Sequence, residues 1–217
     1  MLNEAPTIVQ TLSWVREIGS CEIVVVDGGS EDGTPEVARS FADIMLVVGR
    51  GRASQMNAGA RVATGEILLF LHADTFLPQN FPELLRDALQ DPATIGGRFD
   101  VQLDATGWSF RMIETLMNAR SRLTRIATGD QAIFVRRDAF LDLGGFPEME
   151  LMEDVEFSRR LKRKGKIACL RARVLTSARR WQRDGVFRTI GLMWLLRLAY
   201  FLGVPPRRLR MFYADTR

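Results

Sequence analysis

Cysteine and histidine are scarce in this chain, which narrows the kinds of site that it can hold. Its 217 residues include two cysteines, Cys21 and Cys169, and a single histidine, His72. The cysteines lie far apart and lack the spacing of zinc ligands, so neither a disulfide framework nor a zinc site is expected. Because a protein without disulfides fits a reducing compartment, we predict a cytoplasmic location.

A long, uninterrupted apolar run is also missing. Met1 is followed by polar residues rather than by a basic stretch and an apolar run, so no signal peptide is expected. Val186–Val204 is apolar except for Arg188 and Arg197, and a charge at the centre of a spanning helix costs at least about 2.5 kcal/mol. The segment therefore predicts an amphipathic helix. Packing on the protein or in a homo-oligomer is one interpretation, and peripheral contact with the inner face of the cell membrane is the other.

Acidic residues are not in excess. The formal net charge is +4, and arginines crowd the region from Arg159 to Arg210. Such a region can attract nucleic acid, anionic lipid or phosphorylated substrates. A solvated surface explains most of these arginines, and no nucleic-acid partner is predicted. With 47% hydrophobic and 26% charged residues, the chain can bury an ordinary globular core.

Short apolar runs alternate with segments of helical periodicity, which is typical of an α/β fold with a mainly parallel sheet. The predicted strands are Glu22–Val26, Ile44–Val48, Ile67–Leu71, Gly97–Leu103 and Ala132–Val135. The predicted helices are Pro35–Phe41, Arg52–Ala63, Pro78–Leu89, Trp108–Leu123 and Glu153–Lys164. Because no repeat or long linker divides the chain, we predict a single domain over residues 1–217.

A first candidate site follows the predicted strand Glu22–Val26. Asp27 comes next, before Gly28-Gly29-Ser30, and it should lie at the carboxyl edge of the sheet, where ligands of open α/β sheets bind. Its carboxylate could accept hydrogen bonds from a base or a ribose. The alternative is a helix-capping turn, which Asp32-Gly33-Thr34 before Pro35 also suggests.

A second candidate site is His72-Ala73-Asp74, directly after the predicted strand Ile67–Leu71. A carboxylate at a strand end suits a hard divalent cation that bridges two phosphates, because the phosphates and water supply the other ligands. We predict Asp74 as the metal ligand. His72 is a second candidate ligand, although a structural histidine explains it equally well.

The third candidate is Glu153-Asp154 at the start of the predicted helix Glu153–Lys164. The helix dipole stabilises acidic residues in a first turn, so one carboxylate is explained by capping alone. Two adjacent carboxylates also fit a general base and a neighbour that orients it. Both residues are therefore catalytic candidates.

Further short motifs lie before, between and after these three sites along the chain. They are Leu2-Asn3-Glu4-Ala5, Met56-Asn57-Ala58-Gly59, Ala63-Thr64-Gly65-Glu66, Gly144-Gly145-Phe146 and Arg160-Leu161. Taken together and in this order, the motifs resemble the family 2 glycosyltransferases over nearly the whole chain. Additional motifs resemble a small bacterial subgroup labelled arsenosugar-biosynthesis glycosyltransferases: Arg50-Gly51-Arg52, Gly129-Asp130-Gln131 and Ser177-Ala178-Arg179-Arg180-Trp181.

The resemblance implies roles for individual residues. Glu4, Asp27 and Arg52 would lie around the nucleotide of a nucleoside diphosphate sugar, and Asp154 would be the catalytic base. Asp74 takes the last position of the DXD-type metal motif, in which His72 replaces the usual first aspartate. The remaining binding-site candidates are Asn57, Ala73, Asp130, Arg180 and Trp181, of which the last two resemble the Arg-Trp end of a motif near the acceptor.

The fold that the resemblance implies is GT-A, a Rossmann-like three-layer α/β/α domain. It would span about residues 1–185, with an amphipathic helical extension over about 186–217. The implied reaction moves a sugar to an acceptor hydroxyl with inversion. Mg²⁺ or Mn²⁺ would neutralise the leaving diphosphate, and Asp154 would take the acceptor's proton. Two alternatives are a nucleotide-sugar-binding protein without turnover and a nucleotidyltransferase, although the basic Gly-rich loop usual in the latter is absent.

Two departures from the family pattern matter. Gly28 stands where many members have a second aspartate after Asp27, which leaves open the group that reads the base. Relatives also begin with an apolar strand before Leu-Asn-Glu, whereas here Met1 stands where that strand would end. Either the start codon is assigned too late, or the sheet contains a gap beside the nucleotide.

Overall fold

The computed structural model describes residues 1–213, so the last four residues of the predicted helical extension, 214–217, lie outside the described residues. The strands are β1 (Val24–Asp27), β2 (Ile44–Val47), β3 (Ile67–Phe70), β4 (Thr75–Phe76), β5 (Thr94–Asp104), β6 (Ile133–Arg136) and β7 (Lys166–Ser177). The longer α-helices are α1 (Ala5–Ile18), α3 (Arg52–Val62), α4 (Phe81–Ala88), α5 (Trp108–Thr124), α7 (Glu153–Lys164) and α9 (Val186–Phe201). The shorter helices are α2 (Thr34–Ala38), η1 (Arg39–Phe41), η2 (Gly129–Gln131), α6 (Arg137–Asp142), α8 (Arg179–Asp184) and α10 (Pro206–Arg210).

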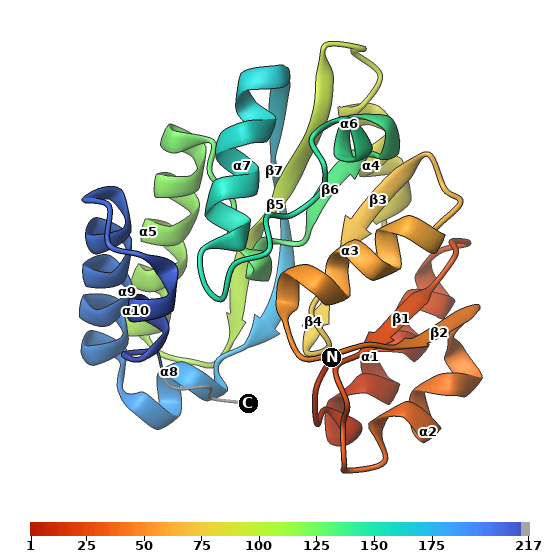
Figure 1. Ribbon diagram of the computed structural model, residues 1–217, viewed down its shortest axis with the longest axis horizontal. Helices are drawn as coiled ribbons and strands as arrows, with labels where there is room; N and C mark the ends of the chain where they lie inside the picture. Colours follow the sequence, from red (N-terminus) through yellow and green to blue (C-terminus); the bar gives the residue numbers. More distant parts are fainter. Residues whose placement is uncertain (214–217) are drawn as a thin grey trace.

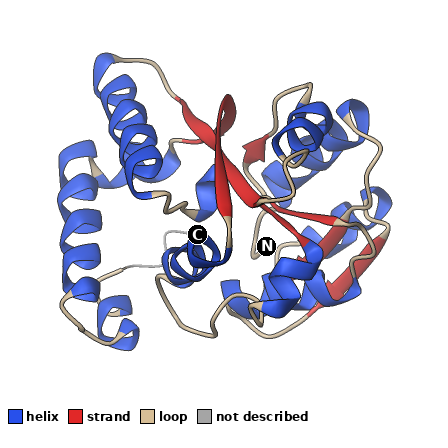
Figure 2. Ribbon diagram, turned by 90° about the horizontal axis from the view of Figure 1, so that it is seen from above, coloured by secondary structure: helices blue, strands red, loops and turns tan. Residues whose placement is uncertain are grey.

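The strands form two sheets with helices on both sides (Figures 1 and 2). β1 and β2 pair in parallel, from Val24 opposite Ile44 to Asp27 opposite Val47. The larger sheet has the order β3-β6-β5-β7-β4. The α/β architecture predicted from the sequence is therefore confirmed.

The prediction of a mainly parallel sheet needs correction, because the larger sheet is mixed. Its long β5–β7 ladder is parallel, but β3–β6, β5–β6 and β4–β7 are antiparallel. The direction of β6 follows from α5, which runs antiparallel to β5 and ends beside the middle of that strand. The chain then enters the sheet still running in that direction, so β6 lies antiparallel to β5. Local periodicity carries no information about strand direction.

One edge of β1 pairs with β2, and the other edge faces Met1. Within residues 1–213, no ladder joins β1 to β3, and the two sheets are separate. On the edge of β1 opposite β2, Met1 makes the hydrogen bonds of a parallel neighbour: its ammonium donates to Val26 O at 2.7 Å, and its carbonyl accepts from Gly28 N at 2.9 Å. Gln55 of α3 also donates its Nε2 to Met1 O at 3.1 Å.

Helix α5 replaces a strand along one edge of β5. β5 pairs with β6 only at Gly96 and Gly97. Farther along, Asn118 of α5 accepts from Val101 N at 2.9 Å and donates to Val101 O at 3.0 Å. Glu114 Oε1 accepts from Leu103 N at 2.7 Å. The side chains of α5 thus satisfy buried backbone groups that a sheet neighbour would otherwise pair.

The predicted amphipathic segment forms α9, which lies at the outer edge of the molecule in both ribbon views (Figures 1 and 2). Its inner face packs through Leu196 into a small core with Ile126, Leu151, Met152, Val155 and Leu209. Its outer face is apolar yet 55–76% exposed, and we call it the outer stripe: Phe187, Trp194, Leu195, Leu198, Phe201 and Leu202. Within residues 1–213, no helix is both long and apolar enough to cross a membrane.

Most predicted elements are confirmed to within a few residues, and α7 has the predicted bounds. Two elements that position the site, α1 and β7, were not predicted, nor were the shorter β4, α6, η2, α8 and α10. The buried Ile8, Leu12 and Val15 of α1 have helical spacing and could have revealed that helix. In β7, the exposed Arg171 and Arg173 break up the apolar pattern, which conceals the strand.

Candidate active site

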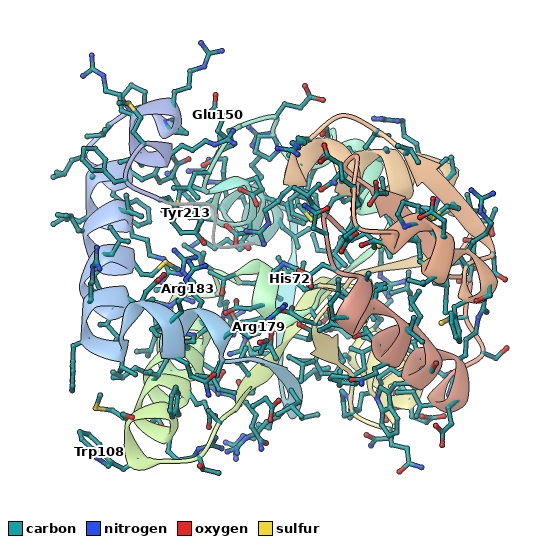
Figure 3. All side chains as sticks on the ribbon, turned by 90° about the horizontal axis from the view of Figure 1, so that it is seen from below. His72, Trp108, Glu150, Arg179, Arg183 and Tyr213 are labelled. Atoms are coloured by element: carbon teal, nitrogen blue, oxygen red, sulfur yellow. The ribbon has the colours of Figure 1, made fainter. Side chains whose placement is uncertain are left out.

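The predicted site residues lie at the ends of separate elements. Glu4 precedes α1, His72 and Asp74 follow β3, and Glu153 and Asp154 open α7. Figure 3 shows His72 and Arg179 near the middle of the molecule, between the N-terminal and C-terminal halves. The site is built from contacts between these segments.

One cluster, which we call the Arg179 bridge, consists of Arg179, Glu4 and Asp74. Arg179 Nη2 donates to Glu4 Oε2 and to Asp74 Oδ2, both at 3.1 Å. Glu4 is buried, and its backbone N–H donates to Thr34 Oγ1 at 2.8 Å. Partial burial lowers the pKa of Arg179, but the hydrogen bonds to the two carboxylates outweigh it and raise that pKa above its ordinary value. Arg179 was not predicted as a site residue, although it lies in one of the subgroup motifs, Ser177-Ala178-Arg179-Arg180-Trp181.

A second cluster centres on Arg52, the first residue of α3. Its Nη2 lies 2.7 Å from His72 Nε2, and its Nε lies 3.3 Å from Glu153 Oε1. Glu153 is 2% exposed. Partial burial lowers the pKa of Arg52, but the negative charges of Glu153 and Asp154 outweigh it and raise that pKa above its ordinary value. A buried carboxylate is thus compensated by a guanidinium that stays charged.

Asp154 differs from its neighbour in both exposure and partners. It is half-buried, accepts from Val155 N at 2.7 Å through Oδ1, and accepts from Gly129 N at 2.8 Å through Oδ2. Gly129 also touches the Arg52 cluster, because a Cβ on it would lie 2.5 Å from Arg52 Nη2 and 2.6 Å from His72 Nε2. Asp154 therefore borders the same small region as Arg52 and His72.

The backbone is strained at three points that flank these residues. Asn3, Ala132 and Met152 have positive φ angles of 53°, 45° and 71°. Asn3 precedes Glu4, Ala132 follows η2, and Met152 precedes Glu153. Such conformations are costly for Ala132 and Met152, whereas asparagine adopts them readily, and a fourth residue of this kind, Arg125, ends α5.

The residues around Asp74 fit a hard divalent cation that takes most of its ligands from a substrate. Asp74 offers a carboxylate whose side chain is 22% exposed. Within residues 1–213, no group of three or more acidic, histidine or cysteine side chains could hold a metal by itself. Mg²⁺ binds in this way, with one or two carboxylates, waters and substrate phosphates. His72 is less suited, because its Nε2 faces a guanidinium, which can only donate a hydrogen bond.

Asp27 has a structural task in this fold. It is fully buried, and its Oδ2 accepts from Gly29 N at 2.8 Å and from Ser30 N at 2.7 Å. Ser30 Oγ donates to its Oδ1 at 2.5 Å. Gly29 has a φ of 86°, which favours glycine. The carboxylate therefore shapes the loop at the sheet edge, and contact with a nucleotide stays a prediction.

Two other predicted binding residues also make structural contacts. Asn57 holds the loop before α7, because its Nδ2 donates to Phe146 O at 2.8 Å and its Oδ1 accepts from Phe146 N at 2.9 Å. Ala73 O accepts from Thr11 Oγ1 of α1 at 2.7 Å. These contacts place Asn57 and Ala73 in the frame around the site.

Some buried polar atoms of Asp130 and Arg120, between the site and α5, have no hydrogen-bond partner among residues 1–213. They are Asp130 Oδ1 and the Arg120 nitrogens Nε and Nη2. Burial, together with the charge of Arg197, lowers the pKa of Arg120 to about 10, although Asp130 and Asp154 counteract this. Arg120 carries no signal in the sequence, because it reads as one arginine of an amphipathic helix.

The two residues of the predicted Arg-Trp pair, Arg180 and Trp181, contact different parts of the protein. Arg180 stacks on the Tyr213 ring, with its guanidinium carbon 4.0 Å from the ring centroid, and donates to the Tyr213 hydroxyl. Trp181 is half-buried and packs against the main core. These contacts hold the pair within the protein, and its role near an acceptor stays a prediction.

Comparisons with known proteins bear on this arrangement. Residues 1–144 match the family model described as Glycosyl transferase family 2. The chain is 27% identical over 161 residues to glycosyltransferase AglE of Haloferax volcanii, a match that covers 67% of this chain and 53% of that protein.

The fold is shared with solved structures. A mannosyltransferase, PcManGT from Pyrobaculum calidifontis in complex with GDP-Man and Mn²⁺, has a TM-score of 0.66 and 24% identity, over 92% of this chain and 59% of that one. S. aureus TarS residues 1–349 in complex with UDP-GlcNAc gives a TM-score of 0.64 and 18% identity, over 82% of this chain and 56% of that one. The implied GT-A fold is thereby confirmed.

The chain spans about half the length of the curated relative described above, 53%. None of the three names concerns arsenosugars, so that subgroup label stays a prediction. The family model covers well over half of the chain and includes Glu4, Asp27, Arg52 and Asp74. The chain therefore belongs to glycosyl transferase family 2.

Proposed function

We propose that this chain transfers a sugar from a nucleoside diphosphate sugar to an acceptor hydroxyl, with inversion. The observation that carries the proposal is the meeting of the Arg179 bridge and the Arg52 cluster. Asp74 of the first and His72 of the second are two residues apart, and Asp154 reaches the second cluster through Gly129. A candidate metal ligand and a candidate base thus adjoin at one place.

The donor belongs on the side of the Arg179 bridge. Similar structures were solved with GDP-Man and Mn²⁺ and with UDP-GlcNAc, which supports a nucleoside diphosphate sugar as the donor class here. Asp74 would hold Mg²⁺ or Mn²⁺, and the cation would neutralise charge on the leaving diphosphate. Glu4 and Arg52 stay candidates for contacts with the nucleotide.

The acceptor belongs on the side of Asp154. A hydroxyl becomes a good nucleophile when its proton is removed as the new bond forms. Asp154 is the better base because it is half-buried, whereas Glu153 is buried and paired with Arg52. Glu153 then acts by holding Arg52 and the start of α7 in place.

The proposal is tested by measuring donor binding and donor turnover together. Nucleoside diphosphate sugars are screened by thermal shift with Mn²⁺, since a ligand at 100 times its Kd adds about 2.7 kcal/mol to the free energy of unfolding. Asp74→Ala should abolish the metal-dependent part of the shift. Asp91→Ala is the control, because Asp91 is an exposed partner of Lys166 away from the site.

Turnover separates the alternatives. Release of sugar from the bound donor supports the transferase, and transfer of the nucleotide supports a nucleotidyltransferase. Binding without turnover, with every acceptor class tried, would leave a nucleotide-sugar-binding protein. Equal shifts with and without metal would refute the role of Asp74.

We also propose that the protein works at the surface of an anionic membrane, through α9 and α10. The outer stripe exposes aromatic and aliphatic side chains at successive helical turns. Residues 186–213 contain five arginines, namely Arg188, Arg197, Arg207, Arg208 and Arg210, and no acidic residue. Glu150, from the loop before α7, pairs with Arg207 and Arg210, but the two helices themselves carry only positive charge. An exposed apolar face flanked by arginines is complementary to an anionic lipid surface. A second copy of the chain is the rival partner.

A further inference from the structure

Arg179 connects two carboxylates that come from distant parts of the chain. It is the first residue of α8, and its Nη2 lies 3.1 Å from an oxygen of Glu4 and from an oxygen of Asp74. A further hydrogen bond, from Arg179 Nε to Ser177 Oγ at 3.1 Å, orients the guanidinium. One nitrogen of one side chain thus contacts both acidic groups, and its single positive charge is shared between them.

The bridge lies where a cation would have to enter. A divalent cation on Asp74 binds a carboxylate oxygen at about 2.0–2.2 Å, next to the guanidinium nitrogen that already contacts Oδ2. A guanidinium does not lose its proton in proteins, so it cannot relieve the repulsion by becoming neutral. Arg179 and the cation therefore compete for Asp74.

The two partners of Arg179 differ in how firmly they are held. Glu4 is 5% exposed and also accepts from Thr7 Oγ1 at 2.8 Å, whereas Asp74 is 22% exposed. The Arg179 side chain itself is 57% exposed. Arg179 can therefore leave Asp74 by a side-chain rotation into solvent, without unpacking the core.

We infer that Arg179 acts as an internal cation that keeps Asp74 occupied until metal and donor arrive together. The donor's diphosphate brings the negative charge that draws Arg179 away from Asp74, and the metal then takes its place. Metal and nucleoside diphosphate should consequently bind with strong positive coupling, while metal alone binds weakly. This inference rests on the proposed function, because it assumes the metal at Asp74.

The test measures Mn²⁺ binding directly, from the electron paramagnetic resonance signal of free Mn²⁺, with and without UDP (or GDP, if the thermal-shift screen selects it). In Arg179→Gln, Mn²⁺ alone should bind about tenfold tighter than to the parent, within the usual range of coupling between sites. UDP should then improve Mn²⁺ affinity less than it does in the parent. No turnover is needed for this readout.

Two variants separate competition from a general field effect. Arg183→Gln removes a positive charge from the same helix, where Arg183 pairs with Asp184, and it should leave Mn²⁺ affinity unchanged. Arg179→Lys keeps the charge but loses the planar guanidinium, and it should give an intermediate affinity. If all three variants tighten Mn²⁺ equally, the bridge has no specific role and the inference is wrong.

The remaining outcomes are also decisive. Arg179→Gln and the parent could bind Mn²⁺ alone with equal affinity, and both could still bind Mn²⁺ with UDP while Asp74→Ala does not. That result overturns the inference and leaves the proposed function standing. Failure of the parent to bind Mn²⁺ even with UDP overturns both.

Discussion

Glu153 and Asp154 are neighbours in sequence, but the start of α7 sends them to different partners. Glu153 points into the protein and pairs with Arg52 at 3.3 Å. Asp154 contacts backbone N–H groups of Gly129 and Val155. Because only one of the two is accessible, their substitutions should have different effects on rate and on binding.

Asp154→Asn keeps the shape of the side chain and removes its basicity. We expect turnover to fall by about 10²–10⁴-fold, the usual contribution of general base catalysis, while donor and metal affinities stay close to those of the parent. The measurement is the rate with saturating donor, beside donor affinity from titration.

Glu153→Gln serves as the comparison, with a smaller loss of rate and a measurable loss of stability because Arg52 loses its buried partner. If Asp154→Asn turned over at the parent rate, Asp154 would not be the base. If Glu153→Gln alone were inactive, the two roles would be reversed.

Gly129 is the residue where an added methyl group should disturb the site most. A Cβ would lie 2.5 Å from Arg52 Nη2 and 2.6 Å from His72 Nε2, so the Arg52 cluster must move. Gly129→Ala should lower turnover by about 100-fold, since a misplacement of about 1 Å in a site can have that effect. Gly49→Ala is the control, because a Cβ there meets nothing within 4 Å. Normal turnover in Gly129→Ala would mean that the Arg52 cluster need not keep this geometry.

At the scale of elements, the contact between α5 and β5 decides how the larger sheet is completed. Asn118 pairs with both backbone groups of Val101, a residue with no exposed surface. The amide thereby acts as one rung of a sheet ladder. The same contact keeps α5 antiparallel to β5 and fixes where the chain leaves for η2 and β6.

Asn118→Ala leaves those two groups buried without partners, each costing roughly 1–3 kcal/mol. We expect the free energy of unfolding to fall by about 2–4 kcal/mol, measured by urea titration. Thr115→Ala, an exposed position on the same helix, should change it by less than about 0.5 kcal/mol. A loss below 1 kcal/mol for Asn118→Ala would indicate that water reaches Val101.

At the scale of the whole molecule, the outer stripe of α9 is an extended apolar face that the described part of the fold leaves exposed. Its side chains are 55–76% exposed, and monomers rarely leave extended apolar patches uncovered. Arg197, in the same helix, lies outside the stripe, and its positive charge lowers the pKa of the half-buried Arg120 of α5. This placement leaves an apolar outer face with arginines at both ends.

The protein should bind vesicles of phosphatidylglycerol and phosphatidylcholine, and bind phosphatidylcholine vesicles more weakly. Salt should weaken the binding, because its electrostatic part is screened with a Debye length of about 8 Å at 0.15 M. Replacing Trp194 and Leu198 by serine should abolish it in a sedimentation assay. Leu141→Ser, which changes an exposed leucine on α6, is the matched control.

Gel filtration distinguishes the rival partner. A dimer that the Trp194 and Leu198 substitutions dissociate, together with no sedimentation of the parent on anionic vesicles, would assign the outer stripe to a second copy of the chain. Sedimentation that is independent of lipid charge would refute the role of the arginines.

The sequence by itself determined the local elements and the order of the motifs. α7 begins and ends as predicted, because its acidic first turn, basic last turn and Gly165 are local signals of helix ends. The ordered motifs likewise predicted the family and placed Asp74 and Asp154 at element ends. Helix ends and single motifs depend on residues a few positions apart, which periodicity and capping rules can read, and the family resemblance needs only the order of such motifs along the chain.

Only the tertiary structure decided which side chains are available for chemistry. Asn57 and Phe146 are 89 residues apart, and Arg179 and Glu4 are 175 residues apart, so no local pattern reveals either contact. The sequence also did not reveal that β6 runs antiparallel to β5 or that β7 pairs with β5. Both pairings depend on how distant segments pack together. A side chain's role follows from its hydrogen-bond partners and its burial, and these are fixed only when distant segments come together.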